Sequence, residues 1–176
     1  PMYVYKTKPT VTNVALPTTV LSNGTQTIYQ YTVTADAAGT IAWRQVKFNV
    51  ATTTVTASTF KLYDSANQST ELANTTCTLA GSTVTCVSTQ DQEVSGSKTY
   101  VLKALIAGAT TNSSISVNIP TGVTTFAAPN TAAAVSAASS FTWSDESVVP
   151  HSATSADWNS DYLVKNLPTD SLTMTK

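Results

Sequence analysis

Charged side chains are scarce in this 176-residue chain. Asp, Glu, Lys and Arg make up 11% of it, and nine basic against ten acidic residues leave a formal net charge of −1. Binding to nucleic-acid phosphates needs clustered Lys and Arg, so we expect no nucleic-acid partner. Disorder caused by charge repulsion is also excluded, because 41% of the residues are hydrophobic.

Long apolar runs are also absent. No stretch approaches the roughly 18 residues of a transmembrane helix, so we expect no membrane span. The start, Pro1-Met2-Tyr3-Val4, lacks the charged and apolar regions of a signal peptide. A chain that begins with Pro1 indicates a processed product, so the missing signal does not argue for the cytoplasm.

Histidine and cysteine are too few for a metal site with four soft ligands, because the chain has one His and two Cys. No pair of nucleophile and base has a recognisable spacing, so we do not expect an enzyme. A catalytic triad of His151 with a Ser and an Asp is one interpretation, but it is uninformative because the chain has so many hydroxyls. We favour a His151 that is hydrogen-bonded within a folded tail.

Threonine is abundant, at about one residue in five, and it favours extended backbone. Short segments with alternating apolar residues are separated by turn residues about every eight to twelve positions. In one segment Tyr29, Tyr31 and Val33 share a face, and apolar residues change parity near Arg44-Gln45, which predicts a bulge. The pattern predicts an all-β, immunoglobulin-like sandwich of about eight short antiparallel strands.

The two cysteines flank a predicted hairpin. Gly81-Ser82 suits a two-residue type II′ turn, and counting outward from it places Cys77 opposite Cys86. At such a non-hydrogen-bonded position the Cα atoms lie about 4.5 Å apart, within disulfide range. The register predicts a disulfide, with two free buried thiols as the alternative, and a disulfide implies an oxidising compartment.

The chain divides into four parts by composition. Residues 1–8 are extended in character and residues 9–126 form the predicted sandwich, with a polar loop expected at Asp91–Ser97. Residues 127–140 are rich in Ala, Ser and Thr, as in a linker or a spacer strand. Residues 141–176 contain two of the three Trp residues, so we expect a partly β segment that packs on the sandwich or on a neighbour.

Two kinds of polar motif are candidate sites. The triplet Asn-x-Ser/Thr marks candidate glycosylation sites at Asn23, Asn67, Asn74 and Asn112. The second motif is a candidate calcium site. Side chains with oxygen atoms stand at alternate positions, as at the start of a calcium-binding loop: Asp157, Asn159 and Asp161. The loop lacks the usual Gly and Glu, so a polar turn is the alternative, and calcium is the one cofactor we consider.

Several short motifs support a resemblance. Thr32–Gly39 is followed by Ile41-Ala42-Trp43, and the tail contains Phe141–Asp145, His151-Ser152, Asp157-Trp158, Tyr162–Lys165 and Leu167–Ser171. With Ser97–Ala104, these resemble the terminal module of large, Thr-rich, surface-layer-like proteins on cells of uncultivated candidate-phyla bacteria. The resemblance implies a secreted or cell-surface location and a structural role, and it supplies no catalytic residues.

The leading hypothesis is therefore an extracellular structural protein, a subunit or module of a filament or surface layer. Open sheet edges accept an extended peptide through main-chain hydrogen bonds, so the partners would be copies of the chain itself. The expected inter-subunit strand lies at Met2, Tyr3, Val4 and Tyr5, with the tail as a second candidate. The rival hypothesis is an adhesive module that binds surface glycans through Trp143 or Trp158.

Overall fold

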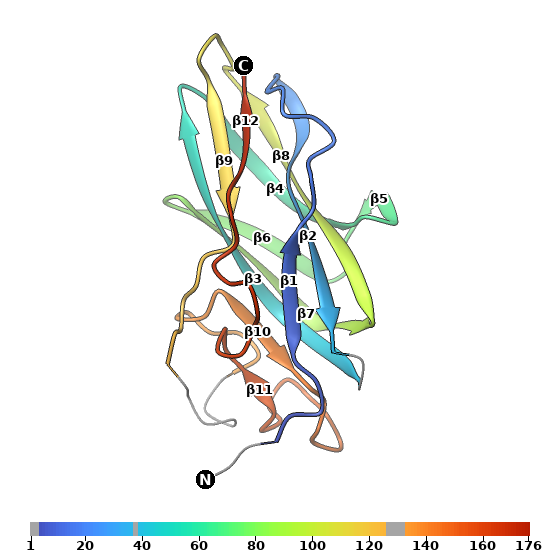
Figure 1. Ribbon diagram of the computed structural model, residues 1–176. Coiled ribbons are helices and arrows are strands. Elements are labelled where there is room, and N and C mark those ends of the chain that lie inside the picture. The colour runs from blue at the N-terminus through green and yellow to red at the C-terminus, as the bar shows by residue number, and fades with distance from the viewer. Residues whose placement is uncertain (1–3, 37–38, 126–132) are drawn as a thin grey trace.

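The protein is an all-β sandwich, as the sequence predicted. The computed structural model describes residues 4–36, 39–125 and 133–176, and these form twelve strands and no helix. The described parts therefore contain no helix that is long and apolar enough to cross a membrane. Figure 1 shows an elongated molecule in which the first described residues and the C-terminus lie at opposite ends.

One layer is a five-stranded antiparallel sheet with β1 at one edge and β5 at the other. Its order is β1 (Pro9–Asn13), β2 (Gly24–Ala35), β8 (Ser97–Ala107), β4 (Thr56–Asp64) and β5 (Asn67–Glu71). Strand β2 carries alternating buried residues, because every second side chain of a strand faces the core.

The second layer has seven strands around the long strand β3 (Thr40–Thr53). On one side of β3 lie β7 (Thr83–Ser95) and β6 (Thr75–Ala80). On the other side, β10 (Phe141–Ser144) and β9 (Ser114–Asn118) pair with successive parts of β3. Further out, β10 pairs antiparallel with β11 (Trp158–Asn159), and β9 pairs antiparallel with β12 (Leu172–Thr175).

Aromatic side chains fill the space between the layers. Tyr29, Tyr31 and Val33 are fully buried, as the alternation predicted. The Trp43 ring meets the Tyr100 ring edge to face at 5.1 Å, and its Nε1–H donates to the Tyr100 hydroxyl at 3.0 Å. Buried Trp and Tyr need such partners for their polar atoms, so this pair fixes the position of both rings.

The predicted bulge in β3 is confirmed, and it has a counterpart in β7. The pairing shifts between Trp43 and Gln45: one residue of β3 lies between these two, but four residues of β7 (88–91) lie between their partners, Gln92 and Val87. The expected polar loop at Asp91–Ser97 is wrong, because β7 continues to Ser95 and only Gly96 turns the chain. Polar composition misled the prediction, since Val94 alternates into the core within this stretch.

The hairpin prediction is confirmed in register and in chemistry. Cys77 lies opposite Cys86, the two form a disulfide, and their Cα atoms are 4.0 Å apart. Of the two turn residues, Gly81 has a positive φ of 62°, which Gly adopts without steric cost. The disulfide therefore joins the edge strand β6 to the interior strand β7.

The tail folds onto the sandwich in two parts that we name separately. The tail root (residues 141–164) adds β10 and β11 beside β3. The tail arm (residues 165–176) runs along β1 and ends as β12 beside β9, as Figure 1 shows in red. Residues 133–140 also lie on the sandwich, where the Gln45 side chain donates to the Ser139 carbonyl at 2.6 Å.

Candidate functional site: the polar cluster under the tail root

Polar side chains from three elements meet where the tail root covers β3 and β7. This polar cluster consists of Arg44, Asp91, His151, Ser155 and Asp157. The bulge explains two of its members, because the extra β7 residues opposite Arg44 bring Asp91 to the outer surface of the sheet. The other three lie in the connection between β10 and β11.

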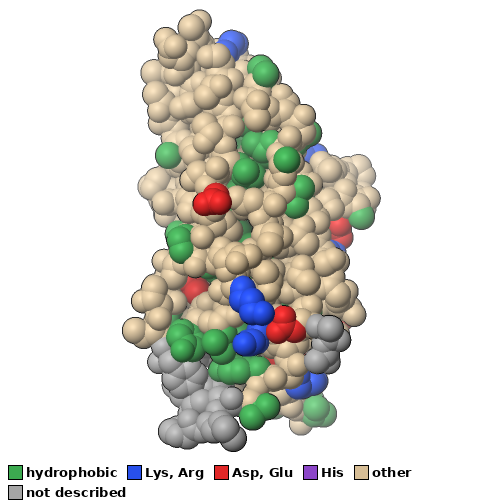
Figure 2. All heavy atoms as spheres, viewed as in Figure 1, with side chains coloured by type: hydrophobic (Ala, Val, Ile, Leu, Met, Phe, Trp, Pro, Cys, Tyr) green, Lys and Arg blue, Asp and Glu red, His purple; other side chains and the backbone are tan. Residues whose placement is uncertain are grey.

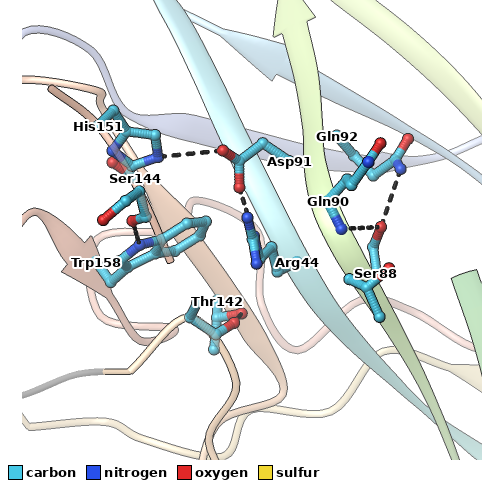
Figure 3. Close-up of polar contacts among 12 residues, drawn as sticks. Arg44, Ser88, Gln90, Asp91, Gln92, Thr142, Ser144, His151 and Trp158 are labelled. Carbon is cyan, nitrogen blue, oxygen red and sulfur yellow. Dashed lines mark hydrogen bonds and ion pairs between the residues drawn. The ribbon is translucent and has the colours of Figure 1, made fainter. Parts of the chain in front are cut away.

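Asp91 connects the sandwich to the tail root. One of its oxygens accepts a hydrogen bond from Arg44 Nε at 2.5 Å, and the other lies 3.6 Å from His151 Nε2 (Figure 3). The Arg44 guanidinium also lies over the Trp158 ring, 5.7 Å from its centre. The His151 ring lies 5.3 Å from the same indole, so Trp158 contacts both Arg44 and His151.

The opposite side of the His151 ring is more crowded. Its Nδ1 lies 3.0 Å from Asp157 Oδ2 and 3.0 Å from Ser155 Oγ, and Ser155 donates to Asp157 Oδ1 at 2.6 Å. A Ser-His-Asp triad requires the Ser on one ring nitrogen and the Asp on the other. Ser155 and Asp157 both contact Nδ1, and Asp91 lies 3.6 Å from Nε2, which is beyond hydrogen-bond distance. The cluster therefore lacks triad geometry and acts as a clamp between segments.

The pKa values of Asp157, which is part of the clamp, and of nearby Glu146 are shifted in opposite directions. Burial raises the pKa of Asp157, but hydrogen bonds from Ser155 and Val148, with His151 nearby, outweigh it, so the pKa lies below its ordinary 3.8. Burial and the charge of Glu93 hold the pKa of Glu146 above its ordinary 4.5. The folded state therefore favours the ionised form of Asp157 and disfavours the ionised form of Glu146.

A second buried carboxylate, Asp161, joins three segments of the chain. Its side chain is 3% exposed and accepts hydrogen bonds from four backbone N–H groups and one hydroxyl. The donors are the N–H groups of Gly122, Val123, Ser140 and Phe141, and Ser139 Oγ. Such charge-assisted bonds are the stronger kind, so Asp161 is the main polar anchor of the tail root.

The backbone approaches Gly122 too closely for any other residue. A Cβ atom built there would lie 2.2 Å from the Ala138 carbonyl oxygen and 2.9 Å from the Ser140 nitrogen. No sequence motif marks Gly122, and the sequence singles out Asp161 only as a candidate calcium ligand, because the contacts between these segments span more than twenty residues of chain.

The candidate calcium ligands Asp157, Asn159 and Asp161 are all buried but serve other contacts. Hydrogen-bond donors surround both carboxylates, and Asn159 Nδ2 donates to the Asp157 carbonyl at 2.8 Å. Across the described ranges, no group of three or more His, Cys, Asp or Glu side chains is placed to hold a metal ion. The structure therefore gives calcium no support, because donors repel a cation.

The candidate glycosylation sites are spread over the surface. All four are exposed and lie in or beside turns: Asn23, Asn67, Asn74 and Asn112. The Asn23 side chain accepts a hydrogen bond from the Ala109 N–H at 2.8 Å, and the Asn74 side chain donates to Gln90 at 2.8 Å. The four positions do not form a shared site.

The candidate inter-subunit strand is described only in part. Met2 and Tyr3 lie outside the described residues, and Val4 is 83% exposed. The Tyr5 ring lies 5.7 Å from the Trp143 ring, and the Lys6 N–H donates to Asp145 at 2.8 Å. Residues 4–8 form no strand; Tyr5 and Lys6 contact the tail root of the same chain, and Thr7 and Lys8 bond to Asp36.

The two tryptophans of the rival glycan-binding hypothesis are inside the protein. Trp143 and Trp158 are fully buried, as expected of a segment that packs on the sandwich, so neither ring is open to stack on a glycan. Their indole N–H groups donate to the carbonyls of Ser160 and Ser152. Both rings therefore have a packing role.

Comparison with known proteins adds no family. No protein-family model matches the chain, and no curated protein matches it either. Function is therefore inferred from the fold and the contacts described above.

Proposed function

We propose that this chain is an extracellular structural protein, a subunit or module of a filament or surface layer that assembles with copies of itself by strand complementation. The observation that carries the proposal is the use of the buried polar groups. Asp161 and the polar cluster bond segments of the chain to one another, and among the buried side-chain atoms described in the cluster only His151 Nε2, 3.6 Å from Asp91, lacks a hydrogen-bond partner. Such contacts favour mechanical stability over chemistry.

Surface composition supports the same proposal. Figure 2 shows a face formed mostly by backbone and uncharged polar side chains, with few Lys, Arg, Asp or Glu side chains. Long-range electrostatic steering toward a charged ligand needs a patch of one sign. Hydroxyl-rich surfaces with little charge instead allow close lateral packing of identical units.

The disulfide supports an extracellular location, and the positions of the two described chain ends support assembly in series. A disulfide such as Cys77–Cys86 persists in oxidising compartments, which favours an extracellular or cell-surface protein. The described ends of the chain lie at opposite ends of the long axis (Figure 1), an arrangement suited to units joined in series. The glycan-binding alternative loses its basis because its candidate rings, Trp143 and Trp158, are buried.

The test is self-association of the purified, oxidised chain. Sedimentation velocity over a wide concentration range, with negative-stain electron microscopy of the concentrated sample, is expected to show oligomers that grow into filaments or sheets. A chain that stays monomeric at millimolar concentration would contradict the proposal. A glycan array on the same sample covers the rival function, and specific sugar binding by a monomer would favour it.

A further inference from the structure

The tail root and the tail arm are held in very different ways. The root contains Trp143, Trp158 and Asp161, all buried. In the arm only Met174 is buried, and most of the other side chains are exposed. The root is therefore fixed to its own sandwich, while the arm is a short extended segment with one deep anchor.

The arm is held mainly through its backbone. Strand β12 pairs antiparallel with β9 over four residues, from Leu172 opposite Val117 to Thr175 opposite Ser114. On its other side the Thr175 N–H donates to the Thr19 carbonyl, and the Leu21 N–H donates to the Thr175 carbonyl, each at 2.9 Å.

This position closes the sandwich. Strand β9 belongs to one sheet, and the segment around Leu21 leads into β2 of the other. The arm therefore fills a slot between the two sheets, and an equivalent strand from another molecule would make the same main-chain bonds.

The first half of the arm is bonded to β1 at Lys165 and then leaves a groove. The Lys165 N–H donates to the Pro9 carbonyl at 3.0 Å, and the Val11 N–H donates to the Lys165 carbonyl at 3.1 Å. A groove of about 360 Å³ then lies between residues 11–13 of β1 and four residues of the arm, Asn166, Pro168, Thr169 and Asp170. Beyond it the arm returns to the sandwich at Thr169, whose N–H donates to the Ile119 carbonyl at 3.0 Å. Between these two attachment points Asn166 and Pro168 are exposed and Leu167 is half-buried against the core, so residues 166–168 have the properties of a hinge between the root and β12.

We propose that the tail arm is exchanged between copies, so that β12 of one copy occupies the slot beside β9 of the next. This inference rests on the proposed function, because it names the strand and the acceptor slot of the assembly. The occupant is a second copy, because an identical arm reproduces the Met174 anchor and each main-chain bond of β12. Exchange changes only the hinge, the condition under which identical segments swap between protomers.

The arm suits this role better than the N-terminal segment. Tyr5 and Lys6 already contact the tail root of their own chain, and residues 4–8 form no strand. One-way exchange gives an open chain of subunits, and reciprocal exchange gives a closed dimer.

A pair of introduced cysteines distinguishes exchange from packing within one chain. Ser116 and Thr173 lie opposite each other, and their hydroxyl oxygens are 3.0 Å apart. In the double variant Ser116→Cys/Thr173→Cys, a mixture of ¹⁴N- and ¹⁵N-labelled chains is assembled from the denatured state, oxidised and digested. Exchange is expected to give cross-linked peptides with one light and one heavy half, together with a ladder of covalent multimers on a non-reducing denaturing gel.

A matched control uses a pair that cannot exchange. Thr32 and Thr99 face each other across β2 and β8 with hydroxyl oxygens 2.7 Å apart. Thr32→Cys/Thr99→Cys is expected to cross-link only within a chain. Exclusively intramolecular links at 116–173 in assembled material would overturn arm exchange and leave the proposed function intact, whereas failure of the unmodified chain to assemble would overturn both.

Discussion

The carboxylate of Asp161 accepts a hydrogen bond from the backbone N–H of Phe141 at 2.9 Å, across twenty positions of the sequence. Phe141 begins β10, the strand by which the tail root joins β3. The bond therefore fixes the strand at its first residue. Because the same carboxylate also receives the Gly122 and Val123 N–H groups, it ties the end of the sandwich to the start of the tail.

Replacing this anchor is expected to loosen the tail root. Asp161→Asn keeps one oxygen but turns an NH₂ group toward buried N–H donors, so the free energy of unfolding should fall by about 3 kcal/mol. Urea denaturation followed by Trp fluorescence measures the loss. Asp170→Asn, at an exposed position, is the control and should change stability by less than about 0.5 kcal/mol. Equal stabilities of the two variants would refute the anchoring role.

A methyl group at Gly122 is expected to be harmful for steric reasons alone. In Gly122→Ala the new Cβ would meet the Ala138 carbonyl at 2.2 Å, so the backbone must move and stability should fall by about 1–3 kcal/mol. Gly39→Ala is the matched control, because its Cβ would lie 3.5 Å from the Thr7 side chain, an ordinary contact. Thermal denaturation of the two variants should separate them by several degrees.

Two buried tyrosines should respond in opposite directions to loss of the hydroxyl. Within the described residues the Tyr31 hydroxyl has no hydrogen-bond partner, so Tyr31→Phe should leave stability unchanged or raise it by about 1 kcal/mol. The Tyr100 hydroxyl accepts from Trp43 Nε1, so Tyr100→Phe leaves a buried donor unpaired and should cost about 1–3 kcal/mol. Chemical denaturation provides the measurement, and a larger loss for Tyr31→Phe would be inconsistent with these contacts.

The clamp should weaken in acid through Asp157. Its folded-state pKa lies below the unfolded-state value, so the ionised carboxylate stabilises the fold above that value, and this contribution is lost as the pH falls through the folded-state pKa. Asp157→Asn should lower the free energy of unfolding by about 1–3 kcal/mol at pH 7. The difference in the free energy of unfolding between variant and parent should become smaller below about pH 4. A gap that stays constant from pH 7 to pH 3 would show that the charge of Asp157 is not involved.

The fold was predictable where one strand pair fixes the geometry. Gly81-Ser82 sets the hairpin register, so the Cys77–Cys86 pairing followed by counting. The parity change near Arg44 likewise revealed the bulge, because a period of two cannot change face without an extra residue. These features need only local sequence.

The site was not predictable because its contacts are non-local. Asp161 and Gly122 are joined by backbone groups that the sequence does not distinguish from those of any other loop. Asp91 was expected in a loop because its neighbours are polar, whereas it belongs to a strand whose bulge turns it toward Arg44 and His151. The burial of Trp158 agrees with the packing expected of the tail, but its contacts with Arg44 and His151 could not be predicted from the sequence.

The position of β12 has a consequence for biosynthesis. Strand β9 (Ser114–Asn118) leaves the ribosome well before β12 (Leu172–Thr175), the strand that pairs with it. In a nascent chain the main-chain groups of β9 on this side therefore stay uncovered until β12 has been made. An uncovered strand edge pairs readily with other chains, so a molecule of this design benefits from export before folding or from a neighbour that supplies an equivalent strand.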